Sequence, residues 1–232
     1  QGFGTRRVCL GLIQRGLVVH QGAPVTDPDG WVDTTDLQIT VQGEPWVYHA
    51  QAYLMLHKPA GTECSQKPSL YPSIYTLLPS PLRQRGGGAA AGVQAVGRLD
   101  QDTTGLLILS DDGKFIHRMT SPRHHVPKVY EVTTKHPIDA TQIAKLIDGV
   151  VLDDDPKPVA AHTATQRDTH QLSLTLTQGK YHQVKRMIAA VSNRVEALHR
   201  SQIGRLTLTD LAPGQWRWLT AQEVSEVSAK VK

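Results

Sequence analysis

This chain of 232 residues has little of what defines several common protein classes. Its two cysteines, Cys9 and Cys64, cannot build a disulfide scaffold or a four-cysteine zinc site, and their scarcity favours a reducing, cytoplasmic compartment. No apolar run approaches the roughly 18 residues that a membrane span needs, so we expect no membrane partner. The start lacks an apolar signal segment and a methionine, and we expect the natural chain to begin before Gln1.

The composition is that of a globular protein with a mild basic excess. Hydrophobic residues make up 39% of the chain and charged residues 20%. Lys and Arg number 25 against 21 Asp and Glu, which gives a net charge of +4 and a pI near 9.1. This excess permits an anionic partner such as nucleic acid without requiring one. The length suits one ordinary domain, or one domain with a small appendage.

A small basic unit is predicted at residues 1–45. Apolar spacing predicts a helix over 5–14, followed by a hairpin and a further strand that ends at Val41. The sequence Gly-Glu-Pro at 43–45 predicts the start of a linker, and we assign residues 46–52 to that linker.

Residues 53–232 predict a mixed α+β domain. The runs GGG and AAA within 83–94 indicate a flexible surface loop, and we assign it no ligand because it lacks a strand-to-helix context. The predicted strands are 53–56, 105–110, 128–134 and 172–176, with a turn at 57–61 and helices at 114–119, 143–150 and 184–191.

Four polar segments lie at predicted strand ends or in loops, where functional sites usually occur. The first, GRLDQDTTG at 97–105, directly precedes a buried strand. A carboxylate in such a glycine-bounded loop can point into a cleft. Alternatively, Asp100 or Asp102 caps the turn by accepting backbone N–H groups.

The second segment, KVYEV at 128–132, places Tyr130 on one face of a strand. This tyrosine is either a core aromatic or a stacking surface for a flat substrate. The third segment, GKYHQVKRM at 179–187, predicts a helix with Lys185 and Arg186 outside its apolar stripe. These cations form a solvated basic face, or one of them pairs with a carboxylate and lowers its pKa.

The fourth segment, TSPRHH at 120–125, combines Arg123 with His124 and His125. Adjacent histidines lack the helical spacing of a zinc pair, and no acid is close by in the sequence, so we predict no metal site. The segment is a phosphate-contact loop or an ordinary stretch of surface.

Together these segments resemble the ribosomal RNA pseudouridine synthases, and in particular their small-subunit type, which modifies 16S rRNA. The likeness covers residues 53–228, with one departure at His57, where the family has asparagine. The N-terminal unit resembles the S4 RNA-binding domain without the beginning of that domain's first helix. The matching segments, in chain order, are 56–61, 97–107, 128–130, 179–187 and 198–214.

The resemblance implies a fold and a set of site residues. The fold is α+β, with a small S4-like domain followed by a catalytic domain on a mixed, mostly antiparallel sheet flanked by helices. Asp100 becomes the catalytic carboxylate and Lys185 its ion-pair partner. Tyr130 lies against the target uracil and helps to remove its C5 proton, while Leu198 packs on the other side. Arg98 enters the RNA stack beside the flipped nucleotide.

The resemblance also implies the partners. The substrate is 16S rRNA, within an assembly intermediate, and the enzyme is expected to be a monomer that needs no cofactor and no metal. Residues expected to contact the RNA backbone are Arg6, Arg7, Arg15, Arg123 and His124.

Three alternatives remain at this stage. The target could be 23S rRNA, or the protein could be a non-catalytic RNA-binding or ribosome-assembly factor. A binding factor has no use for an acid in a cleft for an anionic ligand, which favours the enzyme. A histidine metal hydrolase is the third alternative, and it requires stoichiometric zinc.

Overall fold

The computed structural model describes residues 1–86, 92–153 and 155–229. The chain divides into two compact units, and we treat each of them separately. The small unit comprises Gln1–Ala52 and Leu78–Gln94, and the large unit comprises Tyr53–Leu77 and Ala95–Lys232.

The small unit contains the predicted helix and hairpin. Helix α1 (Arg6–Gln14) begins after Thr5, whose side chain accepts a hydrogen bond from the amide of Val8. It ends before Gly16, which has a φ of 66°. The four strands are antiparallel in the order β2-β1-β3-β4, and their bounds are β1 (Val18–His20), β2 (Ala23–Pro24), β3 (Gln38–Val41) and β4 (Glu44–Val47).

Two segments of the small unit differ from the sequence-based expectation. The linker predicted to start at 43–45 is occupied by β4, an edge strand in which Pro45 is tolerated because one side of an edge needs no ladder hydrogen bond. Helix α2 (Ser80–Gln84) also belongs to this unit, and Arg85 after it donates a hydrogen bond to Gln1. Of the predicted loop at 83–94, residues 87–91 lie outside the described residues.

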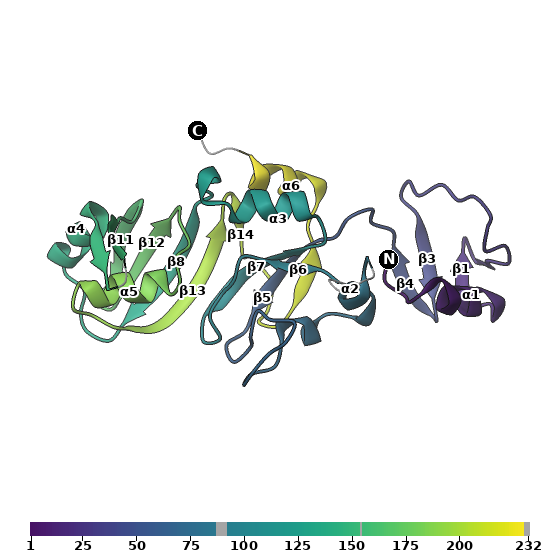
Figure 1. Ribbon diagram of the computed structural model, residues 1–232, viewed down its shortest axis with the longest axis horizontal. Coiled ribbons are helices and arrows are strands. Elements are labelled where there is room, and N and C mark those ends of the chain that lie inside the picture. Colours follow the sequence, from purple (N-terminus) through teal and green to yellow (C-terminus); the bar gives the residue numbers. More distant parts are fainter. Residues whose placement is uncertain (87–91, 154, 230–232) are drawn as a thin grey trace. The chain divides into compact units, whose positions relative to one another are not determined.

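The large unit is built on one mixed sheet (Figure 1). Along the order β11-β12-β8-β13-β7-β5-β15, all neighbours are antiparallel except β13 and β7, which run parallel. In addition, β14 pairs with β13 and β6 with β7. The strands are β5 (Tyr53–Lys58), β6 (Gln94–Val96), β7 (Thr104–Ser110), β8 (Lys128–Thr134), β11 (Thr163–Asp168), β12 (Gln171–Leu176), β13 (Val195–Ile203), β14 (Leu206–Thr207) and β15 (Trp216–Trp218).

Helices cover the two halves of this sheet through separate hydrophobic clusters. One cluster joins α4 and α5 to β8, β12 and β13, and the other joins α3 and α6 to β5 and β7. The predicted α+β class with a mixed, mostly antiparallel sheet is therefore confirmed. The remaining elements are η1 (Ile74–Leu77), α3 (Gly113–Thr120), η2 (Pro122–His124), α4 (Ala140–Asp148), β9 (Val150–Leu152), β10 (Asp155–Val159), α5 (Gln183–Ala190) and α6 (Ala221–Ser228).

One predicted boundary near the centre of the sheet is wrong. The turn expected at 57–61 begins later, because β5 continues through His57 and Lys58 and pairs with β7 as far as Gly105. As for membranes, none of the helices within the described ranges has the length and apolar character to cross one.

Gly105 occupies the point where β7 and β13 approach each other. It has a φ of 112°, and a methyl group added there would overlap the backbone carbonyl and amide of Arg200. We expect Gly105→Ala to lower the free energy of unfolding by about 3 kcal/mol or more in urea denaturation. Gly113→Ala is the control, because no atom lies within 4 Å of a methyl group added there. Equal stability of the two variants would contradict this role of Gly105.

Glu223 links α6 to β15. Its carboxylate lies 2.6 Å from Arg217 and accepts the Thr220 amide at 2.8 Å, and the Arg217 hydrogen bond is the main reason that its pKa falls to about 2. Because that pKa is depressed from 4.5, the stabilisation is present above pH 4.5 and is lost as the pH falls toward 2. We expect Glu223→Gln to cost about 1 kcal/mol at pH 7, after solvent screening, and nothing near pH 2. Urea unfolding of both proteins across this range measures it, and a difference that does not depend on pH contradicts it.

Candidate active site

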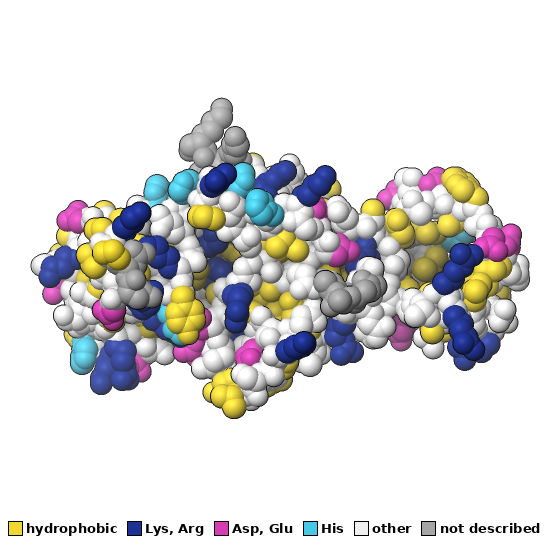
Figure 2. Space-filling view, viewed as in Figure 1, with side chains coloured by type: hydrophobic (Ala, Val, Ile, Leu, Met, Phe, Trp, Pro, Cys, Tyr) yellow, Lys and Arg dark blue, Asp and Glu magenta, His cyan; other side chains and the backbone are white. Residues whose placement is uncertain are grey.

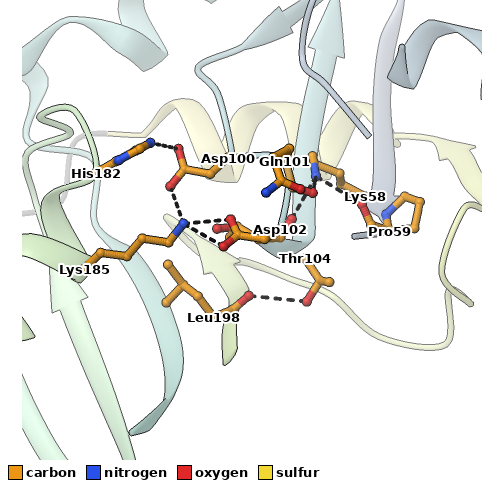
Figure 3. A network of polar contacts seen from close by, with 10 residues as sticks. Lys58, Pro59, Asp100, Gln101, Asp102, Thr104, His182, Lys185 and Leu198 are labelled. Atoms are coloured by element: carbon orange, nitrogen blue, oxygen red, sulfur yellow. Dashed lines mark hydrogen bonds and ion pairs between the residues drawn. The ribbon is translucent and has the colours of Figure 1, made fainter. Parts of the chain in front are cut away.

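A buried lysine holds the loop that precedes β7 in place. Lys58, at the end of β5, is fully buried, and its Nζ donates to the carbonyl oxygens of Pro59 at 3.0 Å, Gln101 at 3.2 Å and Thr103 at 2.9 Å (Figure 3). Burial lowers the pKa of Lys58, and the three carbonyls are the partners that a buried ammonium requires. Two of them belong to the loop at 97–103, so the lysine fixes the path of that loop.

The carboxylate of Asp100 points out of this loop toward Lys185 on α5 and His182 directly before that helix. Its Oδ1 lies 3.3 Å from Nε2 of His182, and its Oδ2 lies 3.1 Å from Nζ of Lys185. The same Lys185 ammonium donates to both oxygens of Asp102, at 2.7 and 2.9 Å (Figure 3). One lysine therefore binds two carboxylates, and the side chain of Asp100 faces Lys185 and His182 instead of capping the turn.

The pKa shifts in this network follow from the same contacts. Burial alone would raise the pKa of Asp102, but the hydrogen bond and charge of Lys185 outweigh it, so the pKa lies below its usual value. Burial alone would likewise lower the pKa of Lys185, but its bonds to Asp102 and Asp100 raise it. The ammonium therefore stays charged at neutral pH.

A pocket opens beside Asp100, with apolar and aromatic walls. Tyr130 on β8 and Leu198 on β13 are both buried and line it, and Arg98 lies exposed at its rim. Tyr130 pairs directly with Arg200 across the two strands, so Tyr130 and Leu198 share one face of the sheet. The structure thus brings five of the residues singled out in the sequence to one pocket: Arg98, Asp100, Tyr130, Lys185 and Leu198.

The other residues singled out as RNA contacts lie elsewhere. Arg123 and His124 are exposed on η2, directly after α3, and Figure 2 shows Lys, Arg and His side chains gathered over the part of the large unit that carries α3. On the small unit, Arg6 and Arg7 on α1 and Arg15 at its end are exposed, and Arg6 is 3.1 Å from Asp29.

Two members of the network were not assigned roles from the sequence. His182 precedes α5 with a φ of 48° and stacks on Tyr181, and this left-handed backbone turns its ring to Asp100. From the sequence, Asp102 is at most a cap of the turn, but in the structure it binds the same lysine as Asp100. The only available signal was their place in segments already singled out. Within the described ranges, no three His, Cys, Asp or Glu side chains gather closely enough to hold a metal ion.

The parallel strand pair, the loop carrying Asp100 and the pocket beside it define an enzyme of the pseudouridine synthase class. The model of the RNA pseudouridylate synthase family matches residues 52–190, and the chain belongs to this family. A crystal structure of a pseudouridylate synthase matches it with a TM-score of 0.71 and 35% identity, covering 96% of this chain and 94% of the other.

Individual members of the family also match this chain over most of its length. The chain is 42% identical over 229 residues to the ribosomal small subunit pseudouridine synthase A of Salmonella typhimurium, covering 98% of this chain and 96% of the relative. It is 43% identical over 197 residues to the protein of the same name from Pasteurella multocida, covering 84% and 81%. An uncharacterized RNA pseudouridine synthase of Bacillus subtilis is 39% identical, covering 96% and 92%.

We expect Lys58→Met to destabilise the large unit and loosen the loop at 97–103. The methionine fills the space but offers no donor. The carbonyl of Thr103 loses its partner, whereas that of Pro59 keeps the Thr62 hydroxyl and that of Gln101 keeps the Gly61 amide, so we expect a cost of about 1–3 kcal/mol in the free energy of unfolding. Hydrogen exchange of the Thr103 amide, which bonds to the carbonyl of Asp100, measures the loosening. Unchanged stability and exchange would show that the lysine does not hold the loop.

Proposed function

We propose that this enzyme converts one uridine of the small-subunit ribosomal RNA, 16S rRNA, to pseudouridine, with Asp100 as the catalytic carboxylate. The observation that carries the proposal is the position of Asp100, between Lys185 and His182 and at the edge of a pocket walled by Tyr130 and Leu198. The names and high coverage of the relatives from Salmonella typhimurium and Pasteurella multocida support the substrate.

The reaction is an isomerisation within the substrate. The N1–C1′ bond of the uridine breaks, the uracil rotates, a C5–C1′ bond forms, and the proton lost from C5 is balanced by one gained at N1. An ionised Asp100 serves this sequence by attack at C1′ or at C6, or by stabilising positive charge at the sugar. Lys185 and His182 hold the carboxylate in place for this step.

The pocket keeps the detached base in position. Tyr130 lies against one face of the uracil and takes part in removal of the C5 proton, and Leu198 covers the other face. Enclosure between them excludes water and prevents the base from diffusing away. Arg98, exposed at the rim, fills the gap that the flipped nucleotide leaves in the RNA stack, which offsets an unstacking cost of a few kcal/mol.

The small unit binds the RNA as an S4-like domain. Exposed Arg6, Arg7 and Arg15 on and after α1 contact the phosphate backbone, as do Arg123 and His124 on η2. The enzyme acts as a cytoplasmic monomer on an assembly intermediate of the ribosomal subunit.

Pseudouridine mapping on unmodified 16S and 23S rRNA, as naked transcripts and as partly assembled particles, tests this proposal. We expect wild-type protein to modify one 16S position, and Asp100→Asn to lose about 10²–10³-fold or more of that activity. Asp102→Asn is the matched control: it removes the second partner of Lys185 and should cost about tenfold or less.

Other outcomes of the mapping have distinct meanings. Modification of 23S rRNA alone would overturn the assignment of 16S rRNA as the target but not the assignment of isomerase activity. Full activity of Asp100→Asn would overturn the catalytic assignment. Tight RNA binding by the wild type with no pseudouridine in either RNA would favour the binding-factor alternative.

A further inference from the structure

The pocket beside Asp100 continues into a larger cleft whose floor carries two further cations. Lys128 on β8 and Arg200 on β13 both line this cleft, together with Tyr130 and Asp100. Within the part of the chain that the structure describes, neither cation forms an ion pair with a carboxylate. The reaction at Asp100 does not account for them.

Arg200 is buried but incompletely satisfied. Only 3% of the residue is exposed, and its Nε donates to the carbonyl of Leu106 at 2.8 Å. Among the described residues, its Nη2 has no hydrogen-bond partner. A buried, unpaired guanidinium nitrogen is costly, and such groups persist where a ligand completes them.

Lys128 adds a second charge at the same place. Its Nζ donates to the carbonyl of Val126 at 2.8 Å. Burial, with the nearby charge of Arg200, lowers the pKa of Lys128 to about 8. Two like charges in a partly desolvated floor destabilise the folded protein unless an anion sits between them.

The register of the strands relates these cations to the pocket. Lys128 and Tyr130 are successive positions on one face of β8, and Arg200 and Leu198 are successive positions on the same face of β13. Lys128 therefore lies one such position from Tyr130, and Arg200 lies one such position from Leu198 and directly opposite Tyr130. Two residues along a strand span about 6.6 Å. An anion bound there is separated from the carboxylate of Asp100, which would repel it.

We infer that Lys128 and Arg200 form a binding site for a backbone phosphate of the substrate RNA, adjacent to the nucleotide held at Asp100. The inference rests on the proposed RNA substrate. A planar guanidinium and an ammonium are the two groups that bind phosphate most often, the first through its fork of N–H donors and the second as a point charge. The phosphate would accept a hydrogen bond from Nη2 of Arg200 and offset the positive charges of Lys128 and Arg200.

Substitution of a phosphate-binding lysine lowers the affinity for RNA, whereas substitution of a structural lysine lowers the stability of the fold. Lys128→Met removes a half-buried cation that has no carboxylate partner among the described residues, so we expect the melting temperature to rise by about 2–4 °C. The same change removes one phosphate contact, so the affinity for an unmodified 16S rRNA transcript should fall roughly tenfold at 0.1 M salt. Because folding is not weakened, the loss of affinity cannot be ascribed to unfolding.

The salt dependence of binding identifies the contact. We expect the slope of log affinity against log salt concentration to become about 0.7 less steep in Lys128→Met, the value for one contact to a single strand. Lys128→Arg keeps the charge and should keep the slope. Lys145→Met, on the exposed face of α4, changes the net charge equally and should leave both affinity and slope unchanged.

The inference is overturned if Lys128→Met binds the transcript like Lys145→Met, or if it loses stability in place of affinity. This assay reads binding and does not depend on turnover. Failure of the proposed function would instead appear as wild-type protein that leaves 16S rRNA unmodified, so the two failures are distinguishable.

Discussion

The large unit depends on the place where β7 and β13 run parallel within an otherwise antiparallel sheet. At that place Gly105 lies against the backbone of Arg200, closer than any side chain would permit. The approach sets the loop at 97–103 beside β13, so that Asp100 from one half of the sheet meets Leu198 from the other. The parallel pair also lies between the two hydrophobic clusters. One cluster stabilises β8 and β13, and the other stabilises β5 and β7.

Charge is the second constraint on the site. The unit holds several cations near the cleft, and each is compensated differently: Lys58 by three backbone carbonyls, Lys185 by two carboxylates. Within the ranges that the structure describes, Lys128 and Arg200 each form a single hydrogen bond, to a backbone carbonyl. A fold selected for stability alone would replace them with apolar residues, because uncompensated buried charge opposes folding. Their retention is understandable if an anionic substrate completes the site.

The network around Asp100 also explains why two carboxylates can lie in a cleft meant for RNA. The Lys185 ammonium offsets part of their charge, so the repulsion of a phosphate backbone is reduced. Arg98 at the rim adds a further positive charge. In the proposed reaction, the cleft therefore holds the carboxylate of Asp100 and still attracts an anion.

Local patterns in the sequence predicted several of the elements that bury one face. The alternation at 172–176 and the helical spacing at 5–14 have this property, and both elements are present. Strand β11 could not be found this way, because it is a polar edge strand with no buried face. The segment 97–107 pointed to the family, since the motif of a loop is a local feature.

Contacts across the chain were decided by tertiary structure alone. Lys58 reads as part of a turn in the sequence, but burial beneath the loop gives it three carbonyl partners. Asp102 and Lys185 are 83 residues apart, and no local pattern predicts their bond. The assignment of 78–94 to the small unit and the unpaired nitrogen of Arg200 likewise follow from packing. Propensity and periodicity act over a few residues, whereas these partners are brought together only when the sheet forms.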